Sequence, residues 1–208
     1  MATGGGHDEL KSVKQGSSKA ISAFRALHGS GCFVMPNPWD AGSAKYLNHL
    51  GFKALATTSA GVAFSRGLPD GVKAMSRDAM LAHIRDIVGA TPIPVNADFQ
   101  SGYADDTEGV AANVTLCVHT GAAGVSIEDA TGSDASPLYA RDLAIQRIRA
   151  ARRAIDATGI PVVLTARCEA WLVGERDPAR TALDRLVAFA DAGADCLYAP
   201  GVRDDATI

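Results

Sequence analysis

The sequence predicts an α/β protein in which parallel strands alternate with helices, and two kinds of observation lead to this prediction. Short apolar stretches alternate with helix-like patterns along the whole chain, which is the order of successive βα units. The apolar stretches also share local patterns, either a glycine before a short strand and a loop of small or polar residues, or an entry through Ile-Pro-Val. They are LGFKALATTSAG at 50–61, TPIPVNAD at 91–98, TGAAGVSIEDATG at 120–132, TGIPVVLTAR at 158–167 and DAGADCLYAPG at 191–201.

Together with a first candidate, GCFVMPN at Gly31–Asn37, these stretches give six predicted strands. Helical patterns fill the intervals between them. Asp40 and Ser76 are suited to cap two of these helices, because a short polar side chain accepts a hydrogen bond from the first free N–H groups of a helix. The predicted helices cover residues 40–50, 76–88, 106–120, 140–158 and 178–192.

The helix predicted at 140–158 has one apolar side and an arginine-rich remainder. Leu143, Ile148 and Ile155 form the apolar stripe that would face the core. We expect the arginines to coat a solvated face rather than to bind a partner. They are Arg147, Arg149, Arg152 and Arg153.

Composition and charge limit the class of protein. The chain has 208 residues, 47% hydrophobic and 21% charged, which is ordinary for a globular protein. The net charge of −3, without a basic block, argues against a nucleic-acid partner, and no apolar run approaches the roughly 20 residues of a membrane span. The four cysteines have no CxxC spacing and are expected to be reduced thiols in a cytoplasmic protein. Residues 1–18 lack the apolar region of a secretory signal and are expected to form a flexible tail before one domain at 19–208.

Two architectures fit alternating strands and helices: an open doubly wound sheet and a (β/α)8 barrel. No GxGxxG follows the first strand, which weakens the case for a dinucleotide-binding sheet. Polar residues gather after the strands, where a barrel carries its functional loops; they are Asp40, Ser59, Asn96, Asp98, Glu128, Asp129, Arg167 and Glu169. This favours the barrel, although an open sheet also binds ligands at that edge. Because a barrel has eight strands and six are counted, a truncated chain, completion by a partner and an open sheet stay as alternatives.

The stretch PVNADFQSGY at 94–103 places an amide and a carboxylate where a strand ends. Asn96 and Asp98 are two positions apart, so they point to the same side of the strand. Neighbouring parallel strands lie about 4.8 Å apart, so Asp98 and Glu128 can face each other. Convergent carboxylates suit a hard cation such as Mg²⁺, or Mn²⁺ in its place. Arg167 on the next strand could hold a substrate carboxylate as a bidentate fork.

Seven segments resemble the isocitrate lyase/phosphoenolpyruvate mutase superfamily, in the order that the family has them. They are PNPWDAGSA at 36–44, TSAG at 58–61, GLPD at 67–70, VNADFQSGY at 95–103, GVSIED at 124–129, TARCE at 165–169 and AGADCLY at 192–198. The resemblance implies a (β/α)8 TIM barrel of that type, here lacking the last two βα units. It also implies Mg²⁺, a small di- or tricarboxylate substrate and a homo-oligomer, either a dimer or a tetramer.

The resemblance assigns roles to matching positions. The substrate's carboxylate or phosphonate end would be bound by the loop Ser59–Gly61, which includes Ala60, together with Asp70 and Arg167. The metal would be held by Asp98, Glu128 and Asn96. The family has Asp-x-Asp where this chain has Asn96-Ala-Asp98, and an amide oxygen coordinates Mg²⁺ more weakly than a carboxylate.

The loop at 129–137, which is predicted to close as a lid, lacks the Lys-x-Cys-Gly-His pattern of isocitrate and methylisocitrate lyases. A standard isocitrate lyase is therefore not expected. Ser133, Thr131 and Tyr103 are the candidate proton donors, and Arg167, Tyr103 and Ser133 the candidate catalytic residues. Cys168 alternates to the side opposite Arg167 and is expected in the core.

The leading hypothesis is a Mg²⁺-dependent lyase that cleaves or forms a C–C bond of a small α-keto or hydroxy carboxylic acid through an enolate. Within enzymes, the alternatives are an oxaloacetate decarboxylase or a C–P bond enzyme like phosphoenolpyruvate mutase. An alternative of another class is a non-catalytic homologue that acts by subunit assembly. Metal binding distinguishes the enzymes from this last reading.

Overall fold

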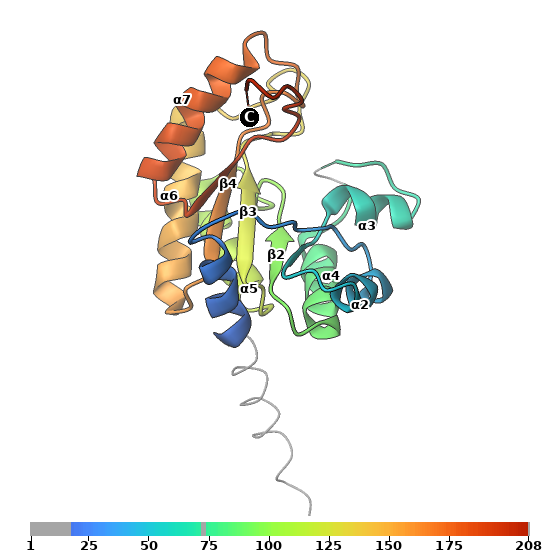
Figure 1. The fold of residues 1–208 in the computed structure, drawn as a ribbon. Helices are drawn as coiled ribbons and strands as arrows, with labels where there is room; N and C mark the ends of the chain where they lie inside the picture. Colours follow the sequence, from blue (N-terminus) through green and yellow to red (C-terminus); the bar gives the residue numbers. More distant parts are fainter. Residues whose placement is uncertain (1–17, 72–73, 208) are drawn as a thin grey trace, which may run out of the picture.

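The computed structural model describes residues 18–71 and 74–207 (Figure 1). Its sheet has five strands in the order β1-β2-β3-β4-β5, and every neighbouring pair is parallel. Because each strand lies beside its neighbour in sequence, the chain advances in one direction, as it does in a barrel, and never returns to a central strand as a doubly wound sheet does. The strands are β1 (Leu55–Ala56), β2 (Val95–Asp98), β3 (Gly124–Glu128), β4 (Val163–Arg167) and β5 (Cys196–Tyr198). The fold is a half-barrel of the predicted type.

Helices α4 to α7 pack against the strands on the outer side of this half-barrel (Figure 1). The caps predicted at Asp40 and Ser76 are confirmed, since their side chains accept the backbone N–H of Ser43 and Ala79 respectively. The helices are α2 (Ala41–His49), α3 (Ser59–Ser65), α4 (Arg77–Ala90), α5 (Thr107–Val118), α6 (Arg141–Thr158) and α7 (Pro178–Asp191). Residues 18–27 are also helical, whereas the remainder of the predicted tail lies outside the described residues.

The strand predicted at 31–37 is wrong. The segment runs beside β1, where the Pro36 carbonyl accepts the N–H of Ala56 at 3.0 Å and the Asn37 side chain donates to the Ala56 carbonyl at 3.1 Å. It forms no ladder beyond these contacts among the described residues. Pro36 has no N–H to donate, and a sheet strand needs donors and acceptors in alternation.

The prediction that the arginines of α6 are solvated is wrong for Arg147. Its side chain is 1% exposed, whereas Arg153 is exposed as predicted. Arg147 lies on the side of α6 that faces α5 and the loop after β2, and its guanidinium stacks 3.9 Å from the centre of the Tyr139 ring. A charge pattern does not reveal this burial, because a buried arginine needs only carbonyl partners and these come from a distant loop.

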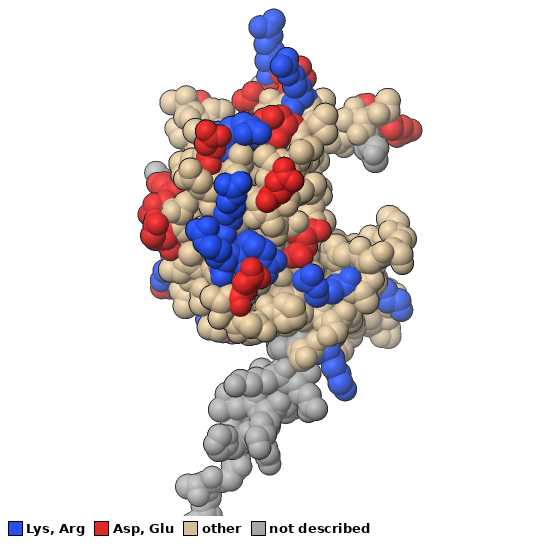
Figure 2. Space-filling model, turned by 90° about the vertical axis from the view of Figure 1, so that its left-hand side faces the viewer, with Lys and Arg blue, Asp and Glu red and all other residues tan. Residues whose placement is uncertain are grey.

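The outer surface over α6 and α7 carries basic and acidic side chains that are interspersed (Figure 2). Arg141 contacts Asp184 at 2.5 Å, and Arg152 contacts Asp156 at 2.8 Å and Asp195 at 2.9 Å. Mixed signs of this kind give no continuous positive surface for a polyanion.

His83 on α4 gives the fold a pH dependence. The side chain is 5% exposed and its Nε2 has no hydrogen-bond partner within the described residues. Burial, with the nearby Arg66, lowers the pKa of His83 below its usual 6.5, against the opposing effect of Asp86 and Asp40. The unfolded chain therefore takes up the proton first, so stability is full above pH 6.5 and is lost as the pH falls below it.

We expect His83→Leu to reduce this dependence. The difference in unfolding free energy between pH 7.5 and 5.5 should shrink by about 1 kcal/mol relative to the wild type. Urea unfolding at the two pH values measures the difference, and His49→Leu, at an exposed position on α2, serves as the control. An unchanged difference in His83→Leu would show that His83 does not titrate between the two states.

Candidate active site

A cavity of about 510 Å³ opens on the inner side of the half-barrel, toward the carboxyl ends of the strands. The register of the strands stacks its polar residues in tiers. Asn96 pairs with Gly124 in the deepest tier, and Asp98, Ser126, Thr165 and Cys196 follow in the next. Glu128, Arg167 and Tyr198 form the tier at the strand ends. Residues in register on neighbouring strands point to the same face, so the predicted juxtaposition of Asp98, Glu128 and Arg167 is confirmed.

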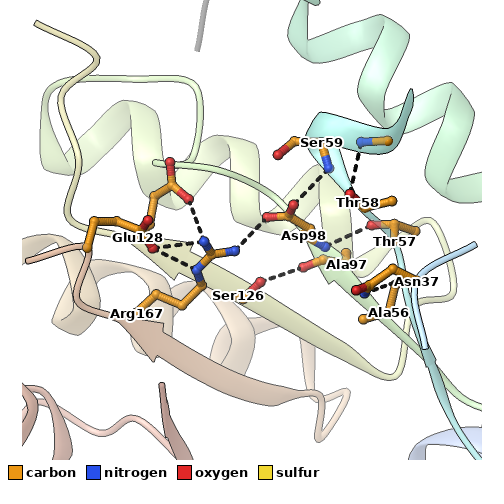
Figure 3. Close-up of polar contacts among 12 residues, drawn as sticks. Asn37, Ala56, Thr57, Thr58, Ser59, Ala97, Asp98, Ser126, Glu128 and Arg167 are labelled. Carbon is orange, nitrogen blue, oxygen red and sulfur yellow. Dashed lines mark hydrogen bonds and ion pairs between the residues drawn. The ribbon is translucent and has the colours of Figure 1, made fainter. Parts of the chain in front are cut away.

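Arg167 lies at the centre of a network of carboxylates (Figure 3). Its guanidinium contacts Glu169 at 2.8 Å, Asp98 at 3.3 Å and Glu128 at 3.5 Å. Glu169 is two residues further along the chain, and its Oε1 accepts a hydrogen bond from Nε of Arg167 at 2.9 Å, which fixes the guanidinium. Arg167 also lies 5.4 Å from the ring of Tyr198. The arginine is thus oriented before any substrate arrives.

The carboxyl groups at this site outnumber the cation. Asp98, Glu128 and Glu169 contact Arg167, and Asp70 lines the same cavity as Arg167, so the fully ionised set carries an excess of negative charge. Burial raises the pKa of Glu128 to about 8; Arg167 opposes this rise, whereas Asp98, Glu169 and Asp70 add to it. Burial is also the largest cause of the raised pKa of Glu169. Asp70 is exposed to solvent on one side, and partial desolvation at the cavity, followed by the nearby Asp98, raises its pKa. A cation bound here would relieve repulsion that the protein alone leaves uncompensated.

The segment Ser59–Gly61 was predicted as a loop and is instead the first turn of α3. Thr58 caps this helix by accepting the N–H of Gly61 at 3.0 Å. A side chain at Gly61 would place its Cβ 2.5 Å from the Thr58 Cγ2, so the close approach requires glycine. The N–H of Ser59 donates to the Asp98 carboxylate at 2.8 Å. The turn therefore borders the cavity and is fastened to the β2 acid.

Two more predicted site residues, Asp70 and Tyr103, lie in different surroundings. Asp70 is exposed on the loop after α3 and lines the cavity. Tyr103 packs against Phe99 with ring centres 5.1 Å apart, and its hydroxyl is buried without a partner among the described residues. Burial raises the pKa of Tyr103 far above its usual value, and the nearby Asp98 and Glu128 add to this effect. Its hydroxyl therefore stays protonated.

Ser133 and Thr131 lie on the loop between β3 and α6, away from the residues that line the cavity. Ser133 is exposed, and its N–H donates to the Thr131 hydroxyl at 3.0 Å. The Thr131 hydroxyl donates to the Ser136 carbonyl at 2.5 Å. In this arrangement neither hydroxyl reaches the cavity, so a catalytic role for Ser133 requires the loop to move.

A metal is implied by the superfamily resemblance, and the donor set is consistent with Mg²⁺. Across the described residues, no three His, Cys, Asp or Glu side chains converge closely enough to hold an ion by themselves. Mg²⁺ does not need such a cage, since it retains several waters and is often bound by one or two carboxylates. Asp98 and Asp70 line the cavity, and Glu128 contacts the cavity residue Arg167 at 3.5 Å, so these acids supply hard oxygen donors and surplus negative charge in and beside it. The residues fit a hydrated Mg²⁺ or Mn²⁺ better than a fully protein-ligated ion.

Several cavity residues were missed by the sequence reasoning. Ser126, Thr165, Cys196 and Tyr198 all line the cavity. Alternation along strands already associated with the site would have identified three of them, because Ser126 and Thr165 lie two positions before Glu128 and Arg167, and Tyr198 is in register with Arg167. Cys196 is in register only with Thr165, which was itself not predicted. Cys168, in contrast, is fully buried, and this confirms its prediction as a core residue.

Comparisons with known proteins agree on one family. The family model described as phosphoenolpyruvate phosphomutase matches residues 24–208. A solved structure from Burkholderia cenocepacia J2315 is 51% identical with a TM-score of 0.89, covering 93% of this chain and 68% of that one. The 2-methylisocitrate lyase of Salmonella typhimurium is 32% identical, over 88% of this chain and 62% of its own length. An oxaloacetate decarboxylase of Rhodopseudomonas palustris is 31% identical, over 91% and 64% respectively.

The chain thus spans less than two thirds of the length of these two curated relatives. Over residues 18–71 and 74–207, no helix is both long and apolar enough to cross a bilayer.

Proposed function

Because the chain belongs to the phosphoenolpyruvate mutase/isocitrate lyase superfamily, whose members are lyases and mutases, we propose that it is a Mg²⁺-dependent lyase acting on a small α-keto or hydroxy carboxylic acid. The reaction would cleave or form a C–C bond next to a carbonyl, through an enolate. The observation that carries the proposal is the excess of carboxyl groups near Arg167, which contacts Asp98, Glu128 and Glu169 and lines the cavity at the carboxyl ends of the strands together with Asp98 and Asp70.

The residues at the cavity have different proposed roles in substrate binding, according to their charge. Arg167 presents a guanidinium that three carboxylates hold in place, which suits it to bind a substrate carboxylate in two-point contact. The first turn of α3, Ser59–Gly61, borders the same cavity and would provide a second contact for an anionic end of the substrate. Asp70 lines this cavity as well. Tyr103 would act as a neutral hydroxyl rather than as a phenolate.

The metal would be held by Asp98 and Glu128, with water completing its shell. When bound, Mg²⁺ supplies Lewis-acid stabilisation of the negative charge that develops on the substrate oxygen. The carboxylates of the protein orient the cation and the arginine. The half-barrel walls exclude part of the bulk water, which strengthens these electrostatic interactions.

Binding of Mn²⁺ and of oxalate, a mimic of the enolate, tests the proposal. We expect calorimetry to detect oxalate binding by the wild type only in the presence of Mn²⁺. Glu128→Gln should weaken this binding by about tenfold or more, which corresponds to about 1.4 kcal/mol. Glu108→Gln, on the exposed start of α5, makes the same change outside the cavity and should bind as the wild type does. A folded wild type that binds neither ligand would refute the enzyme proposal and favour the non-catalytic, assembly role.

Oxaloacetate decarboxylation is the second candidate. The decarboxylase of Rhodopseudomonas palustris resembles this chain to nearly the same degree as the methylisocitrate lyase does, and the loop after β3 lacks the cysteine-containing pattern of the isocitrate lyases. Release of CO₂ from oxaloacetate by the wild type, absent in Glu128→Gln, would select this activity. Size measurement in solution tests the homo-oligomer that the family implies.

A further inference from the structure

Asn96 stands at the position where the superfamily carries an acid, and its side chain has an unusual surrounding. The residue is 5% exposed and lines the cavity from the deepest tier, on the same face of β2 as Asp98. Its Oδ1 is buried and has no hydrogen-bond partner among the residues that the structure describes. A buried carbonyl oxygen without a donor is rare enough to need an explanation.

The space around Oδ1 identifies the direction in which the amide points. Gly124 is in register with Asn96 on β3. A Cβ added at Gly124 would lie 2.4 Å from the Asn96 Oδ1 and 2.5 Å from Cε1 of Phe24. The oxygen is therefore turned toward β3, into the room that glycine leaves, and against C–H groups.

This orientation is also the better of the two that an amide can take. Carbonyl oxygens accept weak bonds from C–H groups, whereas an NH₂ group in the same place would bury two donors against groups that cannot accept. With Oδ1 turned toward Gly124 and Phe24, Nδ2 is the polar atom of the amide that remains to donate a hydrogen bond into the cavity.

We infer that Asn96 is a specificity-determining substrate residue that donates an N–H to an oxygen of the anionic substrate, and not a ligand that offers Oδ1 to the metal. This inference rests on the proposed function, since it concerns the substrate of the same cavity. The cavity already has more carboxyl groups than cations. A neutral donor at this depth attracts the oxygen of a carboxylate, which a further acid would repel.

The isosteric variant Asn96→Asp separates the two roles. It replaces the donor with an oxygen, so the donor role predicts that the tightest-binding member of the series oxalate, malonate and succinate loses at least about tenfold in affinity. The affinity for Mn²⁺ alone is compared in the neutral variant Asn96→Ala, because an added carboxylate attracts a divalent cation by charge alone; the donor role predicts a change within about twofold. A metal-ligand role predicts weaker Mn²⁺ binding in Asn96→Ala, because one oxygen ligand is then lost. Calorimetry measures the dicarboxylates in the presence of Mn²⁺ and then Mn²⁺ alone.

Two further variants complete the experiment. Asn96→Ala removes the donor without adding charge, so it should weaken the dicarboxylate and leave Mn²⁺ binding unchanged; it also serves if the buried acid of Asn96→Asp prevents folding. Asn48→Asp on α2 adds the same charge outside the cavity and should match the wild type. Weaker Mn²⁺ binding in Asn96→Ala, or unchanged dicarboxylate binding in both variants, overturns the inference alone. Failure of the wild type to bind either ligand overturns the proposed function, and the inference with it.

Discussion

Arg167→Met is expected to abolish dicarboxylate binding and to lower the free energy of unfolding by about 3–5 kcal/mol, because it leaves a buried group of like charges without its cation. Arg167 contacts Asp98, Glu128 and Glu169 within 3.5 Å, and its side chain is 16% exposed. Desolvation of the guanidinium is more than offset by these carboxylates, so the pKa of Arg167 lies above its usual value. The arginine thus supports the fold and the binding site together.

Urea unfolding and calorimetry with oxalate and Mn²⁺ separate these two contributions. Arg167→Lys retains the positive charge and loses the planar fork, so we expect it to recover much of the stability but little of the oxalate affinity. Arg176→Met, at an exposed position before α7, should change neither quantity. A stable Arg167→Met that binds oxalate as the wild type does would show that Arg167 is not the substrate-binding arginine.

The sequence was sufficient to predict the features that depend on local pattern. Alternating strands and helices predicted the half-barrel, and the period of two along β2 placed Asn96 and Asp98 on one face. Parallel strands end at the same edge, which is why residues as distant as Asp98 and Arg167 could be expected in contact. Because the superfamily motifs fall at these strand ends, the resemblance and the geometry indicate the same cavity.

Some features were predicted wrongly although the deciding residue is local. The segment at 31–37 has the composition of an apolar strand, but Pro36 cannot donate to a ladder. The segment at 58–61 was predicted as a loop, and its cap by Thr58 makes it a helix start. Other features depend on distant partners that local sequence does not reveal, such as the orientation of the Asn96 amide, which depends on the space at Gly124 on another strand.

Among the features decided by distant partners, the burial of Arg147 has the largest expected effect on stability. Its guanidinium donates to the main-chain carbonyls of Ala104 at 2.6 Å, Asp105 at 2.5 Å and also Ser101. From α5, Asn113 donates to the carbonyls of Gly102 at 2.9 Å and Tyr103 at 3.2 Å. Two side chains thus hold five successive carbonyls of the loop that follows Asp98.

This loop has a conformation that it would not keep unaided. Gln100 and Tyr103 have φ angles of 47° and 56°, in the left-handed region that costs a residue other than glycine about 1–2 kcal/mol. The carbonyl of Gln100 accepts the N–H of Glu128 at 3.0 Å, so the loop is joined to the end of β3. Support by Arg147 therefore reaches both Asp98, which precedes the loop, and Glu128.

Arg147→Met should lower the free energy of unfolding by about 3–4 kcal/mol, since it leaves three carbonyls without their donor. Arg153→Met, on the exposed side of the same helix, should change it by less than about 0.5 kcal/mol. Amide hydrogen exchange at residues 99–105 should speed up in Arg147→Met more than exchange in the core of β3 and β4 does.

The exchange pattern decides how Arg147 acts. If Arg147 only fills the core, its loss accelerates exchange in α6 and the loop alike. If it holds the loop, acceleration is concentrated at 99–105 and Mn²⁺-dependent oxalate affinity falls with it, because Asp98 directly precedes this loop in the chain and the N–H of Glu128 donates to the Gln100 carbonyl within it. Arg147→Lys separates hydrogen bonding from charge, because it keeps the positive charge and at most part of the contacts with the loop carbonyls. Partial recovery of both exchange protection and oxalate affinity in that variant would identify hydrogen bonding to the loop, rather than the charge or bulk of the side chain, as the cause.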